Sequence, residues 1–308
     1  MLNNLNQTIY FITGPTAIGK SDLAIRFAKK VNGVIINADS MQVYSNLKIL
    51  SARPKKKIIN KVNHELYGYV EGSERYSVAN WCNDVLKIID KNEKKNLPSI
   101  LVGGTGMYIE SLIKGLIEMP SIPEFYKKES GKFLKQKGLK NFTKEILLLD
   151  PKALNSISEN DSSRLRRIWE IYKSTGKNYS YWKNKNNKKF LDNFTFKIFL
   201  FIPPRDKIYL NINERFVKMI NEGALEEVKK LKNLKLDKSL PIMKAHGVPE
   251  ILNYLENNAS LEECINRGQQ VTRNYAKRQL TWWRSSTLPI HQVFDQFPNQ
   301  IDENLIKI

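Results

Sequence analysis

A phosphate-binding motif stands near the start of the sequence. Residues 14–21 read GPTAIGKS and match GxxxxGK[ST], directly after a β-branched and aromatic run and directly before a helical pattern. In such a loop, backbone N–H groups and the positive end of the helix face an anion, and the lysine reaches a terminal phosphate. The serine hydroxyl can hold Mg²⁺. The motif therefore predicts that a phosphate chain binds to Gly14, Pro15, Thr16, Ala17, Ile18, Gly19, Lys20 and Ser21, with Ser21 as a ligand of Mg²⁺.

The motif does not say which molecule carries the phosphates. ATP is the default ligand, but the apolar strand ending in Asp that positions water and Mg²⁺ in an ATPase is not clear here. Residues 34–39 (VIINAD) come nearest, yet they follow the phosphate-loop helix immediately. No NKxD motif for reading guanine is present. A diphosphate that is not part of a nucleotide therefore remains open.

The elements that must position this loop alternate between strand and helix. Apolar runs at 8–13, 34–37, 99–102 and 196–202 predict strands, and residues 20–30 have helical spacing. Strands separated by helices predict parallel βαβ units. The expected fold is α/β, with a parallel sheet of the P-loop NTPase type flanked by helices. Its strand C-termini should line the ligand crevice.

A Lys- and Asn-rich stretch between the third and fourth strands has a different texture. Residues 121–194 are mostly helical in pattern, and Asn160 and Asp161 can cap a helix. The apolar stripe of that helix is Leu165, Ile168, Trp169 and Tyr172. We therefore expect a catalytic core of residues 1–120 and 195–308 and a helical insertion of 121–194. Residues 183–189 are expected to form a solvated loop, and the chain after the fourth strand to be helical to its end.

The charge of the chain favours a polyanionic partner. Lys and Arg number 50 against 31 Asp and Glu, which gives a net charge of +19. Nucleic acid or an anionic membrane could satisfy this excess, and so could a merely solvated surface. Cys82 and Cys264 form no CxxC pair, which fits a reducing cytoplasm. Neither a signal peptide nor an apolar run long enough to span a membrane is visible, so we expect a cytoplasmic protein.

A series of motifs in fixed order resembles the bacterial tRNA dimethylallyltransferase family. The phosphate loop is followed by NADSMQVY at 37–44 and LVGGTGMY at 101–108. Shorter blocks follow the same order: SARP at 51–54, YSVA at 76–79, NDSSRLRR at 160–167 and TRNYAKRQLTWWR at 272–284. The resemblance runs from about residue 9 to 285, nearly the whole chain.

The resemblance implies transfer of a dimethylallyl group from dimethylallyl diphosphate to the exocyclic amine of the adenosine 3′-adjacent to the anticodon. Asp39 matches the family's general base, and Thr105 matches a residue that contacts the reacting groups. Arg215 matches an arginine that joins the phosphate loop and Mg²⁺ in stabilising the leaving diphosphate. From the residues alone, Asp39 and Thr105 could instead be helix caps, and Arg215 a surface cation.

The resemblance also implies an RNA surface for the anticodon stem-loop of tRNA. The matching positions are Asp39, Ser40, Met41, Gln42, Thr105, Ser163, Arg164, Leu165, Arg166, Arg167, Lys244, Arg273 and Lys277. Arg273, Lys277 and Arg284 fall on one helical face, which could follow a phosphate backbone or simply be solvated. The enzyme is expected to be a monomer that binds tRNA and the allylic diphosphate, and no membrane.

Three departures from the family pattern leave the expected catalytic groups in place. Leu50-Ser51 replaces a usual Gly-Thr, Glu65 replaces the second of two histidines, and His246 stands where an apolar residue is usual. Two other functions compete with prenyl transfer. One is a small-molecule kinase, which would turn over ATP without tRNA. The other is a nucleic-acid-binding module that uses the loop only as a nucleotide sensor.

Overall fold

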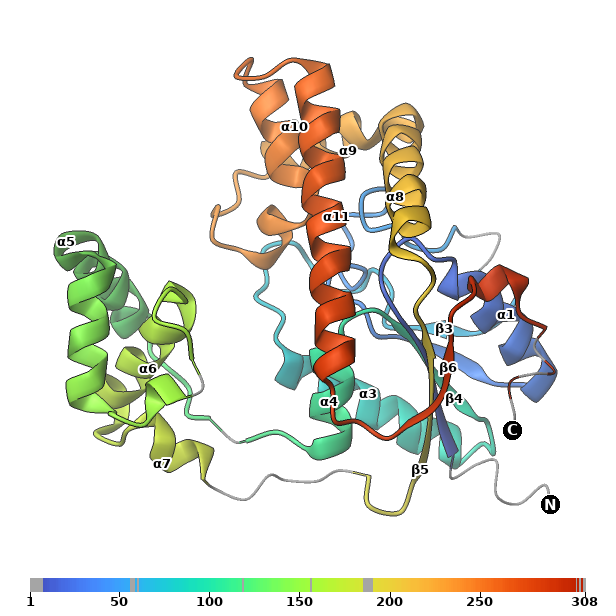
Figure 1. Cartoon of the computed structure of the whole chain (residues 1–308), viewed down its shortest axis with the longest axis horizontal. Coiled ribbons are helices and arrows are strands. Elements are labelled where there is room, and N and C mark those ends of the chain that lie inside the picture. Colours follow the sequence, from blue (N-terminus) through green and yellow to red (C-terminus); the bar gives the residue numbers. More distant parts are fainter. Residues whose placement is uncertain are drawn as a thin grey trace. The chain divides into compact units, whose positions relative to one another are not determined.

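The sheet at the centre of the structure contains six parallel strands in the order β3-β2-β4-β1-β5-β6 (Figure 1). The computed structural model describes residues 8–55, 59, 61–117, 119–155, 157–184, 191–302, 304 and 306. Within these residues the strands are β1 Thr8–Thr13, β2 Val34–Asn37, β3 His64–Glu65, β4 Ser99–Gly103, β5 Thr195–Phe201 and β6 Ile290–Phe294. The predicted parallel α/β fold is confirmed.

The four predicted strands are present, and two more were missed. β1 and β2 have the predicted bounds, while β4 and β5 differ by one residue at their ends. β3 is too short to give a periodic signal. β6 contradicts the expectation that the chain is helical to its end. Its sequence, IHQVF, carries polar residues in the middle, and it becomes a strand because the edge of β5 offers backbone partners.

Both faces of the sheet are covered, as parallel sheets require. Tyr10 and Ile12 of β1 face the core that contains α1 (Lys20–Val31), and Phe27 of α1 packs edge-on against the Tyr10 ring at 5.1 Å. Ile9 and Phe11, which point the other way, are equally buried. The predicted helix after the phosphate loop is confirmed, and its first turn lies at the C-terminal end of β1.

The C-terminal helices bring distant residues to the same end of the sheet. In Figure 1, α11 (Leu261–Ser285) runs alongside α8 (Arg205–Met219), and the two helices are in contact. α8 continues through a π-helix, Ile220–Ala224, into α9 (Leu225–Asn233). The remaining helices of this unit are α3 Val78–Glu93, α4 Gly106–Lys114, α10 Val248–Leu255 and the 3₁₀ turns Pro241–Lys244 and Pro298–Gln300.

Residues 114–190 form a second compact unit, separate from the unit made by 1–113 and 191–308. It contains α5 (Glu124–Leu149), the 3₁₀ turn Ala153–Asn155, α6 (Ser162–Thr175) and α7 (Tyr179–Lys183). The Asp161 side chain caps α6 by accepting a hydrogen bond from the Arg164 N–H at 3.0 Å, as predicted. The predicted stripe is buried at Leu165, Ile168 and Trp169 and half-buried at Tyr172. Residues 185–189 of the expected loop lie outside the described residues.

The described helices include none that is long and apolar enough to cross a membrane. α11, for example, is long, but its exposed face carries charged side chains such as Lys277 and Arg284.

Close packing of α11 on α8 predicts a specific stability defect. A Cβ atom added at Gly268 would lie 2.0 Å from the ring of the buried Phe216. Gly268→Ala should therefore lower the free energy of unfolding by about 1–3 kcal/mol, measured by urea unfolding. Gln270→Ala, on the exposed face of the same helix, is the matched control and should change little. A Gly268→Ala protein as stable as the wild type would contradict this packing.

Candidate active site

The phosphate loop occupies the turn between β1 and α1. Gly14 (φ 144°) and Gly19 (φ 83°) have positive φ angles, which favour glycine. A Cβ atom at Gly14 would lie 2.3 Å from the carbonyl oxygen of Phe201, at the end of β5. The loop can therefore form only because this position has no side chain. The predicted strand–loop–helix context of the motif is confirmed.

Lys20 points back across the loop. Its ammonium group donates hydrogen bonds to the carbonyl oxygens of Gly14 (3.1 Å) and Pro15 (2.6 Å). Burial lowers the pKa of Lys20 to about 7, although the nearby Asp39 carboxylate opposes the shift, and Arg215 adds to it by charge repulsion. A bound anion would reverse this shift because it favours the charged ammonium. Lys20 is therefore placed to gain a proton when a phosphate binds.

This coupling predicts that anion binding depends on pH. Sulfate keeps its charge across the neutral range, so it serves as the probe. Above pH 7 the free protein must take up a proton at Lys20 to bind sulfate, and the apparent affinity should fall by roughly 10–100-fold between about pH 6 and pH 9. Below pH 7 the affinity should level off. Calorimetric titration would measure it.

Two variants test whether Lys20 causes the effect. Lys20→Met should bind sulfate weakly at every pH, without the fall above pH 7. Lys29→Met, which removes an exposed lysine from the same helix, should keep the wild-type profile. A wild-type affinity that stays level to pH 9 would contradict the lowered pKa of Lys20.

Arg215 approaches the loop from α8. Its guanidinium donates a hydrogen bond to the Thr16 hydroxyl at 2.9 Å. Burial lowers the pKa of Arg215, and the Asp39 carboxylate partly restores it. An arginine keeps its charge at such a site. The alternative that Arg215 is a plain surface cation is therefore wrong, because its side chain contacts the phosphate loop.

Gln279 joins the phosphate loop to the glycine turn after β4. The Thr16 N–H donates to Gln279 Oε1 at 2.8 Å, and Gln279 Nε2 donates to the Gly104 carbonyl, also at 2.8 Å. Sequence reasoning missed this residue as part of the site. A signal was available, because Gln279 lies on the buried stripe of α11, and a buried amide must find hydrogen-bond partners.

Asp39 follows the end of β2 and faces the phosphate loop. Its Oδ1 accepts hydrogen bonds from the backbone N–H groups of Met41 (2.9 Å) and Gln42 (3.3 Å). Asp39 therefore does cap the segment that follows it, and these hydrogen bonds fix the position of its carboxylate. Thr105 also supports this turn, since its hydroxyl accepts from the Ser40 N–H at 3.4 Å.

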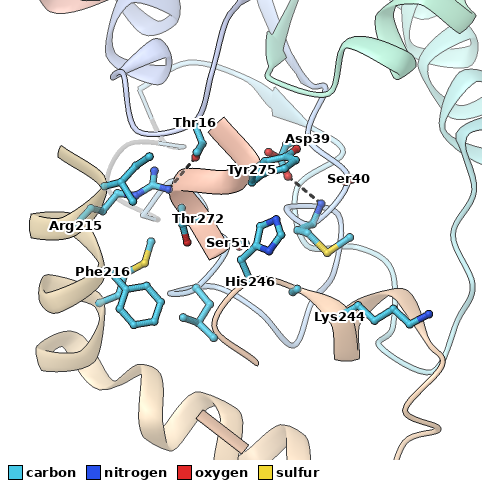
Figure 2. Close-up of a pocket in the computed structure, with 15 residues that line it drawn as sticks. Thr16, Asp39, Ser40, Ser51, Arg215, Phe216, Lys244, His246, Thr272 and Tyr275 are labelled. Atoms are coloured by element: carbon cyan, nitrogen blue, oxygen red, sulfur yellow. Dashed lines mark hydrogen bonds between the residues drawn. The ribbon is translucent and has the colours of Figure 1, made fainter. Parts of the chain in front are cut away.

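These residues meet in a cavity of about 150 Å³, shown in Figure 2. Thr16, Asp39 and Arg215 line its polar end. The other lining residues come from several distant segments: Ser40, Met41, Leu50, Ser51, Ile212, Phe216, Met219, Lys244, Ala245, His246, Thr272 and Tyr275. The cavity thus combines charged groups with an apolar wall. A neighbouring hollow is lined by residues 16–21 of the loop and also by Asp39, so Asp39 lines both spaces.

Direct comparison shows which known proteins this chain is similar to. Residues 42–286 match the family model described as IPP transferase. A tRNA dimethylallyltransferase from Ehrlichia canis is 41% identical over 95% of this chain and 93% of its own length. One from Pelagibacter ubique is 42% identical over 90% of this chain and 88% of its own. This chain belongs to the IPP transferase family.

Solved structures of the family have the same fold. The tRNA isopentenylpyrophosphate transferase of Bacillus halodurans is 31% identical, with a TM-score of 0.65 over 94% of this chain and 89% of that one. A eukaryotic dimethylallyltransferase acting on tRNA is 27% identical, with a TM-score of 0.75 over 90% of this chain and 69% of that one. The resemblance to the tRNA dimethylallyltransferase family, and the P-loop fold expected from it, are confirmed.

The predicted RNA-contacting residues of the first unit divide into two sets. Residues 39–42, Thr105 and Lys244 lie at or beside the cavity. On α11, Lys277 is exposed, but Arg273 is half-buried and donates a hydrogen bond to the Asn213 side chain of α8. The expected cationic stripe is therefore incomplete, because Arg273 is held against the neighbouring helix.

The predicted contacts of the second unit also differ in exposure. Ser163 and Arg164 are exposed on α6. Arg166 donates to Ser130 Oγ (2.9 Å) and the Lys127 carbonyl (2.7 Å), and Arg167 donates to the Pro120 carbonyl (3.1 Å). The prediction that Leu165 contacts RNA is wrong, because its side chain is fully buried in the core of this unit.

Glu227 of α9 shapes the wall of the cavity beside Leu50. Its carboxylate accepts hydrogen bonds from three consecutive backbone N–H groups, those of Lys48 (2.6 Å), Ile49 (2.7 Å) and Leu50 (3.0 Å). Gln42 supports the same segment, since its Nε2 donates to the Ser51 carbonyl at 2.9 Å. Glu227 and Gln42 therefore both stabilise the turn that contains Leu50.

Loss of the Glu227 carboxylate should release this turn. Glu227→Ala leaves three N–H groups without their acceptor, which should lower the free energy of unfolding by about 1–3 kcal/mol. Hydrogen exchange should show faster exchange at the amides of 48–50. Glu226→Ala is the control, because Glu226 is exposed and only pairs with Lys229. Unchanged exchange at 48–50 in the Glu227 variant would rule out this role.

Proposed function

We propose that this protein is a tRNA dimethylallyltransferase, which transfers a dimethylallyl group from dimethylallyl diphosphate to the exocyclic amine of the adenosine 3′-adjacent to the anticodon. The observation that carries the proposal is that Asp39 faces both the phosphate loop and a cavity with an apolar wall. A group transfer from a diphosphate to an amine needs these parts side by side. Family membership and the activity of similar proteins named tRNA dimethylallyltransferase support the same reaction.

The donor fits the two ends of the site. The diphosphate would lie on the phosphate loop, near Lys20 and Arg215, whose charges stabilise it as the allylic carbon–oxygen bond breaks. The apolar allyl group would face Leu50, Phe216 and Met219. Burying it there removes apolar surface from water. An apolar wall suits an allyl group better than the polar ribose of a nucleoside, which favours an allylic diphosphate over ATP.

Asp39 is suited to be the general base. The adenine amine is a weak nucleophile because its lone pair is delocalised into the ring. As the new carbon–nitrogen bond forms, the amine must lose a proton. The described hydrogen bonds to the Asp39 carboxylate all end on Oδ1, so Oδ2 is left to accept the proton.

The donor set around the loop suits Mg²⁺ bound with a diphosphate. Ser21 is partly exposed in the first turn of α1, where its hydroxyl is available as a ligand. No cluster of three His, Cys, Asp or Glu side chains that could hold a metal occurs among the described residues. Mg²⁺ commonly binds through few protein ligands, with phosphate oxygens and water completing its shell. When bound, it would neutralise charge on the diphosphate.

The acceptor would be a base turned out of the anticodon loop. Turning an adenine out of its stack costs a few kcal/mol, which contacts in the pocket can repay. The net charge of +19 suits an RNA partner. The protein is proposed to act as a monomer. tRNA is found in the cytoplasm, and the activity is proposed to take place there.

A transfer assay tests the function. Unmodified tRNA, Mg²⁺ and radiolabelled dimethylallyl diphosphate should give labelled tRNA with the wild type. Asp39→Asn should lower the rate by about 100-fold or more, because the amide cannot take the proton. Asp90→Asn, an exposed carboxylate on α3, is the control and should keep full activity.

Three outcomes can be told apart. Equal labelling with both Asp39 proteins would keep the reaction and refute the role of Asp39. No labelling by folded wild-type protein would refute the function. ATP turnover without tRNA would then favour a kinase.

A further inference from the structure

His246 lies in the wall of the cavity. It follows the 3₁₀ turn Pro241–Lys244 and precedes α10, and it is half-buried. Figure 2 shows its ring pointing inward, near Tyr275 and Asp39. The same residue lines a second hollow of about 180 Å³ with Lys244, Glu250, Asn274 and Arg278. His246 therefore lines two hollows.

The position of the imidazole ring is well defined. It packs on the Tyr275 ring of α11, with centroids 4.7 Å apart and planes inclined by 49°. The Arg278 guanidinium lies over the same tyrosine ring, 5.7 Å from its centroid. The contact with Tyr275 limits the orientations of the imidazole, so its nitrogen atoms keep a defined direction.

The ring nitrogens of His246 have no hydrogen-bond partner among the described residues. His64, in contrast, forms a hydrogen bond between its Nδ1 and the Val62 carbonyl at 2.7 Å. A half-buried imidazole without partners, in the wall of a cavity, has hydrogen-bonding capacity left for a ligand.

The charge state of His246 suits recognition of a neutral base. The charged and titratable groups around it are Asp39, Lys244, Glu250, Tyr275 and Arg278. Burial lowers the pKa of His246, Arg278 lowers it further, and Asp39 opposes the shift. The neutral imidazole that results has one N–H donor and one acceptor.

We propose that His246 reads the target base by donating a hydrogen bond from its imidazole to a ring nitrogen of the adenine. This inference rests on the proposed function. Adenine has acceptor nitrogens, N1 and N7, on either side of the carbon that carries the exocyclic amine. If Asp39 takes the amine proton, a donor on the neighbouring wall can reach one of these nitrogens. His246 would then hold the base in register with the donor carbon, in addition to the RNA contacts assigned to residues 39–42 and Lys244.

The test combines variants of His246 with changes in the base. Anticodon stem-loop RNAs would carry adenine, 7-deazaadenine or 1-deazaadenine at the target position, and kcat/KM would be measured for each. His246→Phe keeps a ring to pack on Tyr275 but removes the nitrogens. On adenine RNA it should lose about tenfold or more in kcat/KM, with an unchanged KM for dimethylallyl diphosphate.

The base analogues decide whether the lost interaction is with the adenine. The wild type should lose a similar factor on one of the two deaza RNAs, and His246→Phe should lose nothing further on that RNA. His246→Gln, whose amide can also donate, should recover part of the activity on adenine RNA. His291→Phe makes the same change on β6, where the histidine is exposed and packs on Phe199, and should leave activity unchanged.

Several results would overturn the proposal. Full activity of His246→Phe would do so, and so would the same loss on all three RNAs or a raised KM for the donor. Thermal melting of each variant would show whether it folds, and if His246→Phe does not fold, the His246→Gln protein across the three RNAs decides. Absence of transfer by the wild type on every RNA would refute the proposed function itself, which is a distinct result.

Discussion

The site depends on the hydrogen bonds that hold the phosphate loop open. The loop backbone must turn its N–H groups toward an anion, and this arrangement exposes dipoles that repel one another when no anion is present. Two helices distant in sequence stabilise it at a single residue. Arg215 of α8 donates a hydrogen bond to the Thr16 hydroxyl, and Gln279 of α11 accepts a hydrogen bond from the Thr16 N–H. The packing of α8 on α11 therefore sets the geometry of the loop.

The same arrangement leaves the charges of the site unbalanced until a ligand arrives. Lys20 and Arg215 are both buried enough to lower their pKa values, and Asp39 is the acidic group that opposes both shifts. A bound diphosphate would add the missing negative charge. Asp39 would then be freer to interact with an amine, because the cations it now stabilises would have a stronger partner. Binding of an anion at the loop would thus change the electrostatic surroundings of Asp39.

The wall of the cavity is stabilised by a different set of hydrogen bonds. Glu227 holds the turn at 48–50, and it is carried by α9, which continues from α8 through a π-helix. Arg215 and Glu227 therefore belong to one chain segment, 205–233, in which a kink at Gly223 (φ 104°) separates the two helical parts. That segment fixes the cationic end of the cavity and its apolar wall together. The departure at Leu50 fits this arrangement, since its N–H is bound by Glu227 and its side chain lines the cavity.

Features of this protein that depend on local pattern can be predicted from its amino-acid sequence. The phosphate loop, the buried strands and α1 follow from a short motif and from hydrophobic periodicity, because neighbouring residues alone decide them. The order of motifs along the chain was sufficient to indicate the family. Asp39 and Thr105 could be proposed for the site because each stands in such a motif, and Arg215 because it matches an arginine of the family. The structure brings all three to the region of the loop.

Features that depend on partners far away in the chain follow from tertiary packing and could not be predicted in this way. β6 is a strand because β5 presents an edge, and its own polar residues gave no sign of this. Glu227 resembles any exposed helical glutamate until the turn at 48–50 is placed against it. Leu165 and Arg273 matched RNA-contacting positions, but one is buried in a core and the other is bound to α8. His246 was a departure without a role until its ring was found in the cavity wall, since the direction of a side chain is set by packing and cannot be read from sequence spacing.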